Sequence, residues 1–255
     1  MQTILITGCS SGFGLETARY FLERDWNVIA TMRTVDATLL PAAPNLRLLA
    51  LDVTDADSIA RAIAAAGPID VLVNNAGIGM LGSVEGTSMA TARDVFETNT
   101  LGTIAMTQAV LPQFRERKDG VIVNVTSTVT VMALPLLSVY TASKAAVNAF
   151  TESLALELQP LNIRVSLVLP GMAPSTRFGA NAGARMQGNP EAYMPLLNSV
   201  FANFKDVKEV TEGKDVAEAV FRAATDPTSP LKLAAGVDAV AWAANSGDRR
   251  FVTPR

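Results

Sequence analysis

The chain has 255 residues, of which 49% are apolar and 18% are charged, and its formal net charge is −3. Cys9 is the sole cysteine and histidine is absent, which excludes an internal disulfide, Cys/His zinc sites and nucleophiles activated by histidine. The weak charge provides no electrostatic footprint for nucleic acid, and no clustered acidic motif indicates a metal site.

The chain also lacks membrane and secretion signals. Residues 1–6 have neither the positively charged start nor the cleavage signature of a secretion signal. No apolar run approaches the ~20 residues that cross a membrane. We therefore expect a cytoplasmic protein without a nucleic-acid or membrane partner.

Short runs rich in Val, Ile and Leu alternate with longer helical segments along the chain. The expected strands are Thr3–Thr7, Asn27–Met32, Leu46–Leu51, Asp70–Asn74, Gly120–Val125, Ile163–Leu169 and Leu231–Leu233. The expected helices are Gly14–Arg24, Ala56–Ala66, Met89–Arg117, Val139–Leu158 and Asp215–Ala224. This alternation predicts one α/β domain over residues 1–255, with a doubly wound, mostly parallel seven-stranded sheet and helices on both faces.

A glycine-rich turn follows the first expected strand and opens the first expected helix. It reads Thr7-Gly8-Cys9-Ser10-Ser11-Gly12-Phe13-Gly14. Glycines here permit close backbone approach to a pyrophosphate, and the helix N-terminus attracts its charge. The turn predicts a dinucleotide site formed by Gly8, Ser10, Ser11, Gly12, Phe13 and Gly14.

The end of the second strand indicates which dinucleotide binds. Sites for NAD place an acidic residue about 20 residues past the glycines, but here Met32 is followed by Arg33. An arginine suits a 2′-phosphate; the alternative is an arginine merely exposed at a strand end. We expect NADP(H) rather than NAD(H).

Residues 172–205 interrupt the strand–helix alternation with several Gly and Pro residues among apolar ones. A long insertion after a strand predicts a lid over a binding site, although its apolar residues could also simply close a flap onto the core. Arg177 and Arg185 within this segment could bind a substrate that carries a carboxylate or a phosphate, which is the alternative to an apolar substrate.

Tyr140 and Lys144 are the candidate proton-transfer pair. Residues four apart share one helix face, and a neighbouring ammonium favours the phenolate. This pattern is weak by itself, but Ser127 stands thirteen residues before the tyrosine, where its hydroxyl could orient a carbonyl oxygen.

Taken together, these motifs resemble the short-chain dehydrogenase/reductase family along nearly the whole chain. They follow the family's order: Thr7–Gly14, Asp52-Val53, Asn74-Asn75-Ala76-Gly77, Asn99, Ser127, Tyr140 with Lys144, and Pro170-Gly171. The turn and Met32-Arg33 are similar to the NADP-preferring branch that includes 17β-hydroxysteroid dehydrogenase-like reductases. The resemblance implies a Rossmann fold.

The resemblance also implies residue roles. Asp52 would bind the adenine amino group with Val53 beside it, Asn75 and Gly77 would line the adenosine ribose and a phosphate, and Asn74 would tie strands together. Lys144 would bind the nicotinamide ribose and lower the pKa of Tyr140, and Asn99 would hold a water in the proton relay. Pro170 and Gly171 would also border the cofactor, and Ser175 or Thr176 would contact the nicotinamide carboxamide.

The expected function is an NADPH-dependent carbonyl reductase, reversible as an alcohol dehydrogenase, acting on a hydrophobic ketone or aldehyde. Val129, Leu134, Leu137 and Met172 are the candidate pocket residues, although some could only pack the lid. The alternative function is a catalytically silent NADP sensor or scaffold of the same fold. By resemblance, the two long helices would pair subunits into a homodimer or homotetramer.

Overall fold

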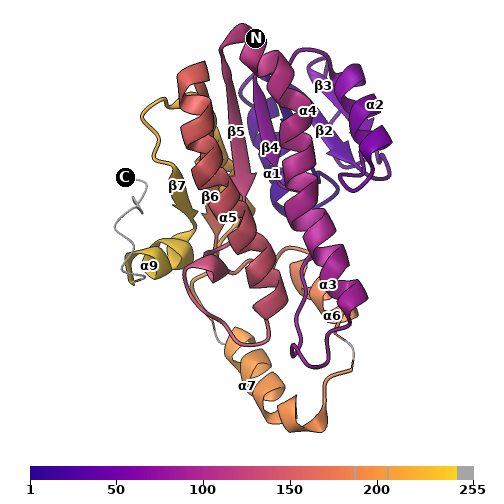
Figure 1. Cartoon of the computed structure of the whole chain (residues 1–255), viewed down its shortest axis with the longest axis vertical. Helices are drawn as coiled ribbons and strands as arrows, with labels where there is room; N and C mark the ends of the chain where they lie inside the picture. The colour runs from indigo at the N-terminus through magenta and orange to yellow at the C-terminus, as the bar shows by residue number, and fades with distance from the viewer. Residues whose placement is uncertain (187, 206, 246–255) are drawn as a thin grey trace.

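The computed structural model describes residues 1–186, 188–205 and 207–245. Within these residues, seven parallel strands form one sheet in the order β3-β2-β1-β4-β5-β6-β7 (Figure 1). The strands are β1 Thr3–Ile6, β2 Asn27–Met32, β3 Leu46–Ala50, β4 Val71–Asn74, β5 Gly120–Val125, β6 Ile163–Pro170 and β7 Lys232–Ala235. The predicted doubly wound sheet is confirmed.

Helices cover both faces of this sheet. Helices α1 (Gly12–Leu22) and α8 (Gly213–Thr225) pack on one face, and α2 (Ala56–Ala66), α4 (Gly102–Arg117) and α5 (Ser138–Leu158) pack on the other. Strand β1 shows why both faces are covered. Ile4 and Ile6 belong to the apolar cluster of α1 and α8, and Leu5 belongs to the cluster of α2, α4 and α5. Alternating side chains that are all apolar require cover on both faces.

The predicted long helix Met89–Arg117 is divided in the structure. Helix α3 (Met89–Phe96) passes into a π-helical turn, η1 (Glu97–Leu101), before α4 begins. Such single π turns often occur at functional sites. Here the turn carries Asn99, which is fully buried.

Residues 172–205 are more regular than their composition predicts. They contain α6 (Phe178–Ala184), the 3₁₀ turn η4 (Glu191–Tyr193) and α7 (Met194–Lys205), and Figure 1 shows α6 and α7 beyond the carboxyl ends of the strands. Short 3₁₀ turns also occur at Thr128–Thr130 (η2) and Gln159–Leu161 (η3), and α9 (Val237–Asn245) follows β7.

Helix α1 begins at Gly12 rather than at the expected Gly14, so the glycine-rich turn supplies its first helical residues. Among the described helices, none has the length and apolarity needed to cross a membrane.

Candidate active site and cofactor cleft

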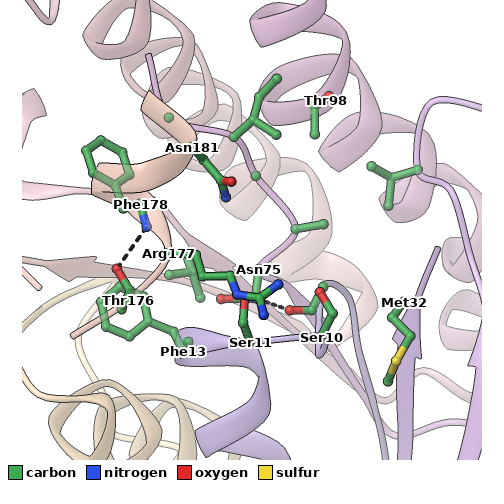
Figure 2. A pocket seen from close by; sticks show the side chains of 18 of the residues that line it. Ser10, Ser11, Phe13, Met32, Asn75, Thr98, Thr176, Arg177, Phe178 and Asn181 are labelled. Carbon is green, nitrogen blue, oxygen red and sulfur yellow. Dashed lines mark hydrogen bonds between the residues drawn. The ribbon is translucent and has the colours of Figure 1, made fainter. Parts of the chain in front are cut away.

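A cleft of about 300 Å³ lies at the carboxyl ends of β1 and β4. The chain leaves β1 toward β2 on one side, while β4 lies on its other side. Ligands of doubly wound sheets bind at this reversal of strand order. Figure 2 shows side chains from the glycine-rich turn, from the segment after β4 and from the lid around the same space.

The glycine-rich turn lies close to the segment that follows β4. Gly8 has φ +76°, and a Cβ on it would lie 2.8 Å from Ala76 Cα, so only glycine fits. Asn75 Nδ2 donates to the carbonyls of Thr7 at 2.9 Å and Gly8 at 3.2 Å. The side-chain amide of Asn75 therefore holds the glycine-rich turn in place, and Asn75 also lines the cleft.

The N-terminus of α1 has the properties of an anion site. Ser11 is the N-cap with extended backbone, its side chain caps no N–H group, and the first turn has no acidic residue. Free N–H groups and the helix dipole therefore point into the cleft. Gly8, Ser10, Ser11, Gly12 and Phe13 line the cleft, whereas Gly14 packs beneath it against Gly8 and Asn75. These residues fit a dinucleotide pyrophosphate.

Arg33, Asp52 and Val53 line another region of the same cleft, as expected of an adenosine site. Asp52 Oδ1 accepts hydrogen bonds from Thr54 N at 2.9 Å and Thr54 Oγ1 at 2.7 Å. These bonds lower the pKa of Asp52, and the charge of Arg33 adds a smaller lowering. Arg33 is thus close enough to place a positive charge beside Asp52.

Tyr140 and Lys144 both line the cleft, and Ser127, which is not a lining residue, lies beside Tyr140. The Ser127 and Tyr140 side chains share a hydrogen bond, and all three residues are buried. Lys144 Nζ donates to Val125 O at 3.0 Å. Tyr140 and Lys144 line the cleft, so a ligand there can reach both.

The pKa of Tyr140 moves opposite to the expected direction. Burial raises it to about 12, and the hydrogen bond with Ser127 opposes this only in part. Burial also lowers the pKa of Lys144 to about 8. In the chain by itself, removal from water therefore outweighs the hydrogen bond that favours the phenolate of Tyr140.

Asn99 positions the segment after β4. Its Oδ1 accepts from Ile78 N at 2.8 Å, and its Nδ2 donates to Ile78 O and Ser143 Oγ, both at 3.0 Å. A Cβ on Gly77 would lie 3.1 Å from Asn99 Oδ1 and 3.3 Å from Lys144 Nζ. Both amide donors of Asn99 are used by protein groups, and its role in a proton relay stays a prediction.

Asn74 lies below this segment, at the end of β4. Its Nδ2 donates to Asn124 Oδ1 at 2.9 Å and to Thr107 Oγ1 at 3.1 Å. Asn74 thus connects β4 to β5 and α4, the structural role that the resemblance implied.

The end of β6 is fixed by buried polar partners. Gly171 N donates to Thr211 Oγ1 at 2.9 Å, and Met172 N donates to Asp238 Oδ2 at 2.6 Å. Asp238 belongs to α9 and fills the space that a Gly171 side chain would need. Pro170, Gly171 and Met172 are not among the residues that line this cleft. Their hydrogen bonds hold the start of the lid, and their contact with the cofactor or substrate stays a prediction.

Thr176, rather than Ser175, faces the cleft. Ser175 is exposed and is not among the lining residues. The Thr176 methyl lies 3.4 Å from where a Cβ on Gly12 would be, and its hydroxyl donates to Ala173 O at 2.8 Å.

The lid packs over Tyr140 through apolar contacts. Val129, Leu134 and Leu137 pack with Tyr140 and with lid residues in one cluster that includes Ala182, Leu197 and Val200. The predicted pocket residues are thus in contact with the lid. Phe178 of α6 also packs against Tyr140, with ring centroids 5.1 Å apart.

Three lid residues that sequence reasoning did not assign to the cofactor also line the cleft: Arg177, Phe178 and Asn181. The sequence offers one indication of this position, because these residues closely follow Thr176, a candidate for contact with the nicotinamide carboxamide. With these residues, the lid forms one wall of the cleft and the glycine-rich turn forms another.

Residues 2–187 match the family model described as short chain dehydrogenase. Retinol dehydrogenase 8 of Bos taurus is 42% identical over an alignment of 182 residues, and the match covers 67% of this chain and 58% of that protein. Estradiol 17-beta-dehydrogenase 1 of Rattus norvegicus is 37% identical over 234 residues, covering 82% and 68% respectively. The closed form of serine dehydrogenase complexed with NADP+ has a TM-score of 0.80 at 28% identity, covering 92% of this chain and 94% of that one. The chain thus spans less than two thirds of the retinol dehydrogenase.

Proposed function

Because this chain belongs to the short-chain dehydrogenase family, we propose that it is an NADP(H)-dependent oxidoreductase that interconverts a hydrophobic ketone or aldehyde and its alcohol. The observation that carries the proposal is that Tyr140 and Lys144 line a cleft that fits a dinucleotide, with Ser127 beside Tyr140 as its hydrogen-bond partner. The bound nicotinamide would supply or accept the hydride.

Ser127, Tyr140 and Lys144 have complementary roles in carbonyl reduction. The hydroxyl of Ser127 would donate a hydrogen bond to the carbonyl oxygen and orient it. Tyr140, whose raised pKa keeps the phenol protonated, would donate its proton to the developing alkoxide. The ammonium of Lys144 would then stabilise the phenolate through its charge.

Two observations support the cofactor and the substrate class. Arg33 supplies a cation at the adenosine end where NAD-binding folds have a carboxylate, and the serine dehydrogenase structure holds NADP+. The lid over Tyr140 is apolar, and two of the relatives are named for retinol and estradiol. Both features favour an apolar carbonyl substrate.

The test is NADPH consumption with a panel of aryl and alkyl ketones and aldehydes. We expect turnover with apolar members and a loss of about 100-fold or more in kcat for Tyr140→Phe, because its proton donor is removed. Tyr20→Phe, on α1 and outside the cleft, is the matched control and should retain activity. Turnover by Tyr140→Phe as fast as by the parent would refute the mechanism. A parent that binds NADPH but consumes none with any member of the panel would favour the silent sensor or scaffold.

Assembly and location remain predictions. A homodimer or homotetramer formed through α4 and α5 would cover Leu156, an apolar residue of α5 that is 73% exposed. The expected cytoplasmic location follows from the sequence features described above.

A further inference from the structure

Arg177 lies where the lid meets the glycine-rich turn. It is the N-cap residue of α6, it is exposed, and it lines the same cleft as Ser10, Ser11 and Asn75. Thr176, the residue before it, packs on Gly12. Figure 2 shows the Arg177 guanidinium directed toward the region of the cleft lined by Ser11 and Asn75.

The charge of the cleft is positive although the chain is acidic. Its charged lining residues are Arg33, Lys144 and Arg177 against Asp52, whereas the whole chain carries −3. Arg33 adjoins Asp52, and Lys144 is beside Tyr140. Among the described residues, no carboxylate forms an ion pair with Arg177. Its charge is therefore available to a ligand.

We propose that Arg177 binds the pyrophosphate of the dinucleotide, so that the lid itself contributes to cofactor affinity. This inference rests on the proposed function. The uncapped N-terminus of α1 already favours a phosphate beside Ser11. A guanidinium directed at the same place can donate two parallel hydrogen bonds to phosphate oxygens.

The position of the next residue connects this contact to the chemistry. Phe178 packs against Tyr140 and occupies the space that a Gly79 side chain would need. An anion held by Arg177 thus fixes the start of α6, and with it the ring that covers the catalytic tyrosine. Cofactor binding and closure of the lid are coupled through two adjacent residues.

The experiment measures Kd by calorimetry for three ligands. They are NADP+, its nicotinamide-free fragment (2′-phospho-ADP-ribose), and 2′-AMP, which lacks the pyrophosphate. Arg177→Met should weaken binding of the first two by about tenfold or more, because the hydrogen bonds from the guanidinium to a charged group are lost. It should leave the affinity for 2′-AMP within about twofold. Arg185→Met is the matched control, because Arg185 is also on the lid but donates to Asn181 O and does not line the cleft. It should leave all three affinities unchanged.

The outcomes separate this inference from the proposed function. Unchanged binding of 2′-phospho-ADP-ribose by Arg177→Met, or an equal loss for 2′-AMP, would overturn the role of Arg177 while NADP+ binding by the parent stands. A parent that prefers NAD+ would refute the assignment of Arg33, but the same comparison with NAD+ and ADP-ribose would still test Arg177. A parent that binds no nicotinamide dinucleotide would refute both proposals.

Discussion

The ring of Phe178 meets the ring of Tyr140 edge to face, with 5.1 Å between the ring centroids and 63° between their planes. One residue belongs to the lid and the other to α5, so this contact connects the glycine- and proline-rich insertion to the proposed proton donor. Aromatic pairs in this geometry are favourable beyond their burial. The contact also removes the phenol from water.

Replacing Phe178 should therefore change the acidity of Tyr140. Burial is the cause that raises the pKa of Tyr140 to about 12, so Phe178→Ala should lower this pKa toward its ordinary value of 10 by admitting water. The phenolate absorbance near 295 nm, taken as the difference between each protein and its Tyr140→Phe counterpart, measures the midpoint. Leu196→Ala, an exposed lid residue, is the control. An unchanged midpoint in Phe178→Ala would show that other residues keep water from the phenol.

Lys144→Met should abolish activity and yet stabilise the protein at neutral pH. Burial lowers the pKa of Lys144 from 10.5 to about 8, so below pH 8 the folded state holds a charged group that the unfolded state hydrates better. The substitution also removes the hydrogen bond to Val125. The net increase in the free energy of unfolding is therefore on the order of 1–2 kcal/mol.

The pH dependence gives this prediction a second check. Between pH 8 and 10.5 the folded lysine is neutral while the unfolded one is still protonated, so the parent gains stability as pH rises. The advantage of Lys144→Met measured by urea unfolding should shrink through this range. Lys208→Met, at an exposed position, should change little at any pH; a destabilised Lys144→Met at pH 7 would contradict the argument.

Arg33→Asp should reverse the cofactor preference. A carboxylate at this position repels a 2′-phosphate and accepts a hydrogen bond from a 2′-hydroxyl, so NADPH binding should weaken by about 10- to 100-fold while NADH binding changes far less. The Kd values of both cofactors, from fluorescence titration, are the measurement. Arg61→Asp, on the exposed side of α2, controls for net charge. Equal losses for both cofactors would eliminate the 2′-phosphate assignment.

The sheet could be predicted from the sequence because its strands are apolar on both faces. Leu5 faces one cluster while Ile4 and Ile6 face the other, and such runs have few stable arrangements other than a covered parallel sheet. The glycine-rich turn was predictable because a tight strand-to-helix turn needs glycine. Gly8 has a positive φ and lies too close to Ala76 for a side chain.

The divided helix around Asn99 was not predictable from periodicity. Residues 89–117 read as one helix, yet the chain makes a π turn at Glu97–Leu101. Asn99 there bonds to Ile78 and Ser143, partners 21 and 44 residues away. Helical periodicity describes neighbours within about four residues, so it does not register such contacts.

The local sequence by itself determined the strands, the phosphate-binding turn and the pairing of Tyr140 with Lys144, because each depends on residues adjacent in the chain or one helical turn apart. Only the tertiary structure decided that Thr176 rather than Ser175 faces the cleft, that Arg177 lines the same cleft as the glycine-rich turn, and that Phe178 packs against Tyr140. The physical reason is that these positions depend on how a distant segment packs. Met172 is held by Asp238, 66 residues further along the chain, and this contact fixes where the lid begins.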